Sequence, residues 1–320
     1  MCAAVAARRW PGPARPGYTR GEKGGDSSLL RHRPGGQTVA PAGSSLIVIA
    51  ICTFRRPEAL SRLLDHLNTT APVLEGRARV LVVDNDPAAS AREAVHGREL
   101  TFAHEPRPGV AHARNRALAE ARRLGAAWLA FLDDDELPTE GWLDALLGTQ
   151  REHPADVVAG PVVAQLSPEL EWARPYLTRR RYPSGTPVSY WGAGNVLLRL
   201  DALERVGEFS PAYSSGGEDT HLSARCARAG LRMVWCDEAL VSEPTDASRA
   251  NPEWLIGRSR LAGEIIARVE RELGASLLRR RINGLFRIVA GTLALPVARL
   301  VGRGLKVEIF RARGEGMLRG

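Results

Sequence analysis

The chain has 320 residues, of which 44% are hydrophobic and 25% charged, an ordinary composition for a globular protein with one large or two smaller domains. Its net charge of +8 is almost all arginine, since Lys23 and Lys306 are the only lysines, and the excess is spread along the chain. No nucleic-acid-binding motif accompanies this charge, and the four cysteines show no C-x-x-C spacing, so neither nucleic-acid binding nor a zinc site is expected.

The first half of the chain alternates between strand-like and helix-like patterns. Residues 1–44 are rich in Arg, Gly, Pro and Ala without apolar periodicity, and we predict that they are disordered. The elements expected after them are strand 46–51, helix 58–67, strand 80–83, helix 90–96, strand 100–104, helix 111–124 and strand 126–132. This order is typical of an α/β fold with a doubly wound, mostly parallel sheet.

After residue 141 the pattern is looser. The expected elements are strand 157–164, a Pro- and Arg-rich loop over 167–187, strand 195–198, helix 220–229, strand 231–236, and helices over 252–272 and 277–301. We therefore expect C-terminal helices to follow the sheet.

Four consecutive acids, Asp133 to Glu136, follow the apolar run 126–132. The carboxyl end of a buried parallel strand opens into the crevice where α/β sheets bind ligands. Carboxylates crowded there repel one another unless a cation is present, and Mg²⁺ shares carboxylate ligands with substrate phosphates. The run therefore predicts a metal–diphosphate site, and the alternative for an isolated acidic run is the start of a helix.

Other polar residues flank the ends of the neighbouring strands. Thr53-Phe54, Asp84-Asn85 and Arg114-Asn115 are expected to meet Asp133 to Asp135 along one edge of the sheet. An aromatic ring, amide and carboxylate groups, an arginine and a metal together suit a nucleotide diphosphate. Because no G-x-G-x-x-G or G-x-x-x-x-G-K loop is present, a dehydrogenase and an ATPase are both disfavoured.

A second cluster, residues 214–221, has the sequence Ser-Ser-Gly-Gly-Glu-Asp-Thr-His and enters a predicted helix. Two adjacent carboxylates at a helix start can serve as simple caps. Beside a metal–diphosphate site, a carboxylate here also suits a general base for an acceptor hydroxyl.

These motifs, in this order and spacing, resemble those of inverting glycosyltransferases of family 2, which have the GT-A fold. The similarity covers roughly residues 46–263 and is greatest to the ExoM-like group of exopolysaccharide transferases. It rests on the segments Ile49–Pro57, Val82–Asp86, Pro108–Asn115, Phe131–Pro138 and Gly216–Thr220, and on a tail from Val241 to Arg258.

The resemblance implies roles for individual residues. Asp219 is the expected catalytic base, and Glu218 is expected to hold the acceptor. Asp135 and Asp133 match the D-x-D positions that bind a divalent metal, Mn²⁺ or Mg²⁺. Glu243 stands where many members have a metal-binding His, and whether it joins the metal site stays open. The implied donor-binding residues are Thr53, Phe54, Arg55, Asp84, Asn85, Arg114, Asp133, Asp134, Trp191 and Asn195.

The resemblance also implies the partners: a nucleotide-sugar donor, with a UDP-sugar the leading expectation, and a saccharide or lipid-linked acceptor. Two alternatives remain at this point. A nucleotidyltransferase would need a Gly-rich, Lys-containing loop after the first strand, which Thr53 to Arg56 do not supply. A non-catalytic carbohydrate-binding protein would not need both Asp135 and Asp219.

The expected domains are residues 1–44, a glycosyltransferase domain over 45–263, and a helical tail over 264–320. Within the tail, residues 282–301 are apolar but contain Arg287, Arg299, Gly291 and Pro296, which disfavours a membrane-spanning helix. One interpretation of 277–301 is an amphipathic helix at a membrane surface, with Arg279 to Arg281 meeting anionic lipid. This would place a cytoplasmic protein on the inner face of the cell membrane. The alternative is a helix packed against the core.

Overall fold

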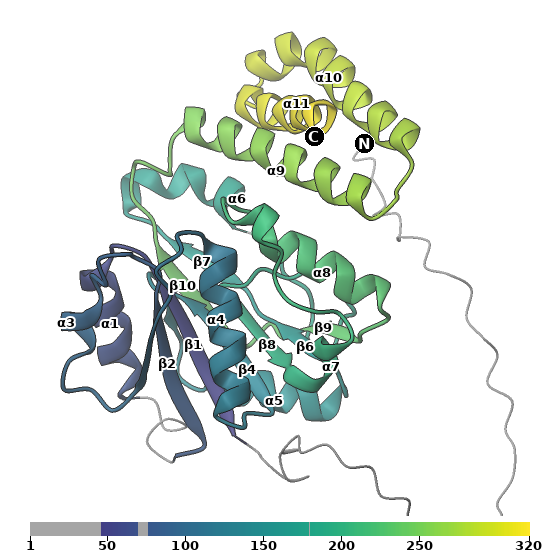
Figure 1. Ribbon diagram of the computed structural model, residues 1–320. Helices are drawn as coiled ribbons and strands as arrows, with labels where there is room; N and C mark the ends of the chain where they lie inside the picture. The colour runs from purple at the N-terminus through teal and green to yellow at the C-terminus, as the bar shows by residue number, and fades with distance from the viewer. Residues whose placement is uncertain (1–45, 70–75, 179) are drawn as a thin grey trace, which may run out of the picture. The chain divides into compact units, whose positions relative to one another are not determined.

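The structure is a computed structural model that describes residues 46–69, 76–178 and 180–320. The expectation of disorder over residues 1–44 lies outside these residues, as does Arg179 of the predicted loop. Figure 1 shows a central sheet with helices on both of its faces. The seven strands of this sheet run in the order β3 (Thr101–His104), β2 (Ala78–Asp84), β1 (Ile47–Thr53), β4 (Trp128–Asp133), β8 (Asn195–Arg199), β6 (Val157–Ala159) and β9 (Met233–Trp235). The chain therefore winds outward from β1 in both directions.

The central strands are apolar on both faces because helices cover both. In β1 (Ile47–Thr53), Val48 and Ala50 face one cluster of buried side chains, while Ile47, Ile49 and Ile51 face the other. Helices α4 (Val110–Arg123) and α8 (Glu218–Arg228) belong to the first cluster. Helices α1 (Pro57–Leu67) and α5 (Trp142–Glu152) belong to the second. The predicted α/β fold with a doubly wound, mostly parallel sheet is confirmed.

The remaining strands show where the pairing is parallel. β1 pairs in parallel with β2 (Ala78–Asp84) and β4 (Trp128–Asp133), and β2 with β3 (Thr101–His104). β8 (Asn195–Arg199) is antiparallel to β4 and to β6 (Val157–Ala159), and β9 (Met233–Trp235) is parallel to β6. The carboxyl ends of β1, β2 and β4 therefore meet at one edge, as the sequence predicted.

A small second sheet was not expected. It contains β5 (Leu137–Pro138), β10 (Val241–Pro244) and β7 (Val162–Gln165), in that order. The strand predicted over 157–164 is divided between the two sheets at Gly160-Pro161. A Cβ at Gly160 would lie 2.5 Å from the Ala239 carbonyl oxygen, and Pro161 has no N–H to donate to a ladder, so the chain leaves the large sheet here. The small sheet brings Glu243 beside the end of β4.

Short helices complete the part of the fold around the sheet. The predicted loop over 167–187 contains a 3₁₀ helix, η1 (Pro168–Ala173), and α6 (Arg174–Leu177). The others are α3 (Arg92–Val95), α7 (Leu200–Glu204) and η2 (Pro211–Tyr213).

Three long helices end the chain: α9 (Pro252–Glu272), α10 (Leu277–Leu300) and α11 (Gly304–Arg319). The first two match the predicted helices closely, while α11 was not predicted. α11 packs against both α9 and α10 (Figure 1). α9 runs without interruption past residue 263, where the sequence suggested that a tail begins. Among the described residues, no helix combines the length and apolar character needed to cross a bilayer.

Candidate active site

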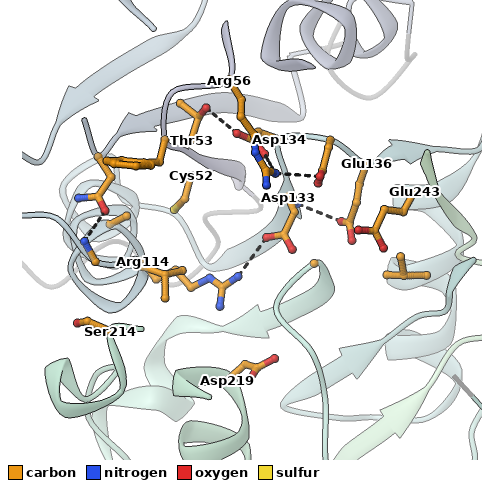
Figure 2. A pocket seen from close by; sticks show the side chains of 18 of the residues that line it. Cys52, Thr53, Arg56, Arg114, Asp133, Asp134, Glu136, Ser214, Asp219 and Glu243 are labelled. Atoms are coloured by element: carbon orange, nitrogen blue, oxygen red, sulfur yellow. Dashed lines mark hydrogen bonds and ion pairs between the residues drawn. The ribbon is translucent and has the colours of Figure 1, made fainter. Parts of the chain in front are cut away.

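A cavity of about 860 Å³ opens at the carboxyl ends of β1 and β4. Residues from the start of α4, the start of α8, β10 and the first turns of α9 line it. Figure 2 shows this cavity from close by. Its charged side chains are of both signs: Asp133, Asp134, Asp135, Glu136, Asp219 and Glu243 face Arg56, Arg114, Arg249 and Arg258. The edge of the sheet at which the sequence predicted a site therefore forms one wall of this cavity.

Asp134, after β4, links the end of β4 to the end of β1 by a hydrogen bond. It is buried, and its carboxylate accepts the Thr53 hydroxyl at 2.6 Å and Arg56 Nη1 at 3.1 Å. Burial raises its pKa, although both of these hydrogen bonds act in the opposite direction. With its oxygens occupied in this way, Asp134 orients the loop that carries its two neighbours.

Asp133 and Asp135 are the more accessible acids of the run. Asp133 accepts Arg114 Nη2 at 3.1 Å, and its side chain is 45% exposed. Asp135 accepts Arg56 Nη1 at 2.8 Å and lies 3.5 Å from Arg249 Nη2. Both carboxylates thus line the cavity while paired with an arginine, and Figure 2 shows the pairing of Asp133 with Arg114.

Two further acids lie behind them. Glu136 is buried under Gly194 and accepts the Asp133 N–H at 3.0 Å. Burial raises its pKa well above the usual range, and Asp133 and Glu243 act in the same direction. The pKa of Glu243 is also raised, first by burial and then by Asp135, while Arg249, which donates to it, opposes the rise. The local negative charge is therefore only partly offset.

These donors fit a divalent metal ion. Among the described residues, no three His, Cys, Asp or Glu side chains already form a metal-binding cluster. Mg²⁺, however, is usually held by one or two carboxylates, its own waters and substrate phosphates. Asp133 and Asp135 line the cavity and offer hard oxygen ligands of this kind.

Across the cavity, α8 begins at Glu218, directly after Gly217, whose backbone is left-handed with φ of 91°. Asp219, in the first turn, lines the cavity opposite Asp133 (Figure 2). Asp219 Oδ1 accepts the Thr220 N–H at 2.5 Å and the Thr220 hydroxyl at 3.2 Å, while Oδ2 accepts the Tyr190 hydroxyl at 3.4 Å. The carboxylate is thereby fixed in orientation at the cavity wall.

Glu218 has a different environment from its neighbour. It is buried and accepts a hydrogen bond from Arg114 Nη1. The other amino group of Arg114 reaches Asp133, so this arginine connects the two acidic walls of the cavity. Glu218 was predicted to hold the acceptor; the structure places its side chain against Arg114 instead of in the open part of the cavity.

Thr53, Phe54 and Asn85 form the side of the cavity next to β2. Phe54 is 44% exposed, which leaves its ring available to a ligand. Asn85 is buried, and its amide donates to the carbonyls of Glu105 and Arg107 at 3.0 and 2.7 Å and accepts the Gly109 N–H at 2.8 Å. Asn85 therefore shapes the loop before α4 with the same side chain that was predicted to bind donor.

Four predicted donor-binding side chains are not brought into the cavity. Asp84 is fully buried and accepts the N–H groups of Asp86 and Ala91 at 2.9 and 2.8 Å. Arg55 extends to Asp86 at 3.3 Å. Trp191 is buried, with its ring edge-on to Phe209 at 6.4 Å. Asn195 is also buried, and three hydrogen bonds explain its position.

Asn195 joins the two sheets in the interior. Its Nδ2 donates to the carbonyls of Pro161 and Ala239 at 2.9 and 2.7 Å, and its Oδ1 accepts Trp142 Nε1 at 2.8 Å. Both polar atoms of this buried side chain are thus engaged by protein groups, and only its neighbour Gly194 reaches the cavity. The geometry supports a structural role at this position.

Several cavity residues were given no role from the sequence. Arg56 pairs with Asp134 and Asp135, Arg249 with Asp135 and Glu243, and Arg258 lies 5.0 Å from the Trp254 ring. The hydrophobic periodicity of the sequence does not indicate that these arginines belong to the site, because they lie in three separate segments. Only the resemblance of the tail, which includes Arg249, Trp254 and Arg258, indicated that α9 belongs to the site.

The fold is shared with known sugar-transferring enzymes. The structure superposes on that of a mannosyltransferase from Pyrobaculum calidifontis, solved with GDP-mannose and Mn²⁺, with a TM-score of 0.58, 18% sequence identity and 85% of both chains covered. This likeness identifies the fold as the GT-A fold.

Residues 48–206 match the family described as glycosyl transferase family 2, and residues 128–295 match glycosyl transferase family group 2. The chain belongs to glycosyltransferase family 2. It is 35% identical to the succinoglycan biosynthesis protein ExoM of Rhizobium meliloti, over 70% of this chain and 74% of that protein. It is also 29% identical to the pre-mycofactocin glycosyltransferase of Mycobacterium tuberculosis, over 68% of this chain but only 46% of that protein. Family membership sets aside the nucleotidyltransferase and non-enzyme alternatives.

Proposed function

We propose that this enzyme transfers a sugar from a nucleotide-diphosphate donor to an acceptor hydroxyl with inversion at the anomeric carbon. The observation that carries the proposal is that Asp219, Asp133 and Asp135 line one cavity, with Asp219 opposite Asp133 (Figure 2). A base on one wall and a charge-binding site on the other suit in-line displacement of a diphosphate.

In the proposed step, Asp219 takes the proton of the acceptor hydroxyl. The acceptor oxygen forms a bond to the anomeric carbon while the bond from that carbon to the diphosphate oxygen breaks, and the nucleotide diphosphate leaves. Because Thr220 holds Oδ1 at the shorter distances, Oδ2 is the oxygen better placed to accept the proton. Burial raises the pKa of Cys52, also in the cavity, to about 12, so its thiol stays protonated and a covalent route through it is disfavoured.

Asp133 and Asp135 would hold a divalent cation beside the diphosphate. Such an ion, when bound, neutralises charge on the leaving nucleotide. Arg56, Arg114 and Arg249 surround the same carboxylates, and their guanidinium groups can exchange a carboxylate partner for a phosphate oxygen. Phe54 offers an exposed ring for the base, and Trp254 and Arg258 flank the opening on the α9 side.

The proposed donor is a UDP-sugar. The P. calidifontis enzyme was solved with GDP-mannose, which makes a GDP-sugar the alternative to be tested. The similarity to a succinoglycan biosynthesis protein supports a growing saccharide as acceptor, either free or attached to a lipid.

A donor panel tests the proposal directly. Purified enzyme is mixed with UDP-, GDP- and dTDP-sugars and Mn²⁺ or Mg²⁺, and the released nucleotide is measured with and without EDTA. We expect metal-dependent release from one donor, and an anomeric configuration opposite to that of the donor in the product by NMR. Asp135→Asn should raise the Mn²⁺ concentration needed for half-maximal rate, while Asp144→Asn, on the exposed side of α5, should not. Retention of configuration, or full activity in EDTA, would refute the proposed mechanism.

A further inference from the structure

The helix α10 has its large apolar side chains on the outside and its small ones on the inside. Gly284, Gly291 and Ala298 are buried, and a Cβ on Gly284 would lie 2.9 Å from Leu318 of α11. The exposed side chains on the opposite side include Leu278 (69% exposed), Leu293 (75%) and Leu300 (87%). α10 therefore packs closely on α11 through its small residues, and the bulky residues on the opposite side gain no burial from that contact.

Eight exposed apolar residues of α10 form one continuous row. At 3.6 residues per turn they fall within an arc of about 120°, along a helix about 36 Å long. We call this row the outer face of α10; its members are Leu278, Ile282, Leu285, Phe286, Val289, Leu293, Val297 and Leu300. Leaving eight large apolar side chains in water is costly, and a row of this size is typical of an interaction surface.

The charged residues of α10 itself are all arginines, and one of them, Arg299, is paired with Glu308 of α11. Arg279 and Arg281 are exposed near the start of α10, and by helical spacing they lie on either side of the row. From residue 273 to residue 307 the chain contains six arginines and one lysine and neither Asp nor Glu. Arginines beside an apolar face suit the boundary between anionic headgroups and acyl chains.

We propose that the outer face of α10 docks on an anionic lipid bilayer, with the helix lying in the plane of the membrane surface. Self-association through the same face is disfavoured, because a two-fold interface would bring the arginines of one copy against those of the other. Spanning is also excluded for the described helices, none of which is long and apolar enough. The proposal does not rest on the proposed transfer reaction.

Vesicle co-sedimentation of the full chain tests this proposal without donor or acceptor. We expect binding to vesicles of phosphatidylcholine mixed with phosphatidylglycerol, weaker binding to phosphatidylcholine alone, and a decrease as salt is added. Leu293→Gln should weaken binding about tenfold, and Leu285→Gln with Leu293→Gln further still. Leu261→Gln, at a 51% exposed leucine of α9 outside the row, is the matched control and should bind normally.

A variant that lacks two of the arginines separates the electrostatic contribution to vesicle binding from the apolar one. Arg279→Gln with Arg281→Gln should reduce binding to the phosphatidylglycerol vesicles and leave binding to phosphatidylcholine unchanged, whereas Arg62→Gln on α1 should change neither. Because all these positions are exposed, thermal unfolding should be close to wild type for every variant. Absence of vesicle binding, or binding that Leu285→Gln with Leu293→Gln leaves intact, would overturn the proposal. A dimer in light scattering that the same variant dissociates, without vesicle binding, would identify a second copy as the occupant.

Discussion

Arg114 of α4 and Glu218 of α8 form an ion pair in which both side chains are buried, 8% and 5% exposed respectively. The same guanidinium also donates to Asp133 at the end of β4. One side chain therefore fixes the distance between the helix that carries Asp219 and the strand that carries the candidate metal ligands. Arg114 was expected to approach the diphosphate; in the structure it first holds the two walls of the cavity in place.

Removing one member of this pair should destabilise the protein. Arg114→Gln leaves the Glu218 carboxylate buried without its partner, and we expect a loss of about 3–5 kcal/mol in the free energy of unfolding, measured in urea. The double variant Arg114→Gln with Glu218→Gln removes both charges and should recover part of that loss. Equal losses in the single and double variants would show that the pair is not the source of the effect.

Asp219 is predicted to act in the chemical step without contributing to stability. Asp219→Asn keeps the shape of the side chain but removes its capacity as a base, so transfer should fall about 10²- to 10⁴-fold at an unchanged melting temperature. Asp201→Asn, at a 72% exposed carboxylate on α7, is the control and should keep full activity. If the Asp219→Asn enzyme transfers sugar at a rate within threefold of wild type, another residue must be the base.

Asn195 is predicted to contribute to stability and not to donor affinity. Asn195→Ala removes the partner of the Ala239 carbonyl and of the Trp142 indole N–H and one of two partners of the Pro161 carbonyl, and we expect a loss of about 2–4 kcal/mol. The folded fraction should retain the wild-type KM for donor, measured below the melting temperature. A raised KM with unchanged stability would instead restore the donor-binding role suggested by the sequence.

His221 is predicted to make the protein sensitive to mild acid. Burial lowers its pKa below the usual 6.5, although Glu272, 3.1 Å from Nε2, acts in the opposite direction, and its ring stacks on Tyr213 with centroids 4.6 Å apart. Because the unfolded chain binds the proton more readily, the contribution of the neutral ring is complete above pH 6.5 and is lost as the pH falls through 6.5 toward the folded pKa.

The corresponding measurement is the free energy of unfolding as a function of pH, for wild type and for His221→Gln. The variant should show a smaller decrease between neutral and mildly acidic pH. Parallel curves for the two proteins would mean that other groups cause the acid sensitivity.

Much of the fold could be predicted because its strands and helices have clear local patterns. Strands such as 46–51 and 126–132 are apolar on both faces, and α9 and α10 carry helical spacing and begin at side-chain caps, Asn251 and Ser276. The two-residue strand β5 and the four-residue β10 are too short for any periodicity, and their pairing depends on contacts about a hundred residues apart. α11, with buried Ala312, Gly314 and Gly316, lacks the apolar spacing by which a helix is predicted.

The candidate site was predicted in its location more than in its details. Residues at strand ends must meet at one edge, so Thr53, Asn85 and Asp133 were placed together from the sequence alone. Whether a polar side chain points into the cavity or inward depends on side-chain rotamers and on distant partners. Asp84 and Asp133 both end parallel strands, yet Asp84 is fully buried under backbone N–H groups while Asp133 is half exposed.

The antiparallel insertion of β8 between β4 and β6 has a consequence for the newly made chain. Once β4 has paired with β1, its other edge has no partner until residues 195–199 emerge, about sixty residues later. At 5–20 residues per second, synthesis of that stretch takes roughly 3 to 12 seconds. During this interval the apolar edge of Leu129 to Leu132 is open to pairing with another chain. Slow translation or high expression should therefore favour aggregation through β4 before the enzyme can complete its sheet.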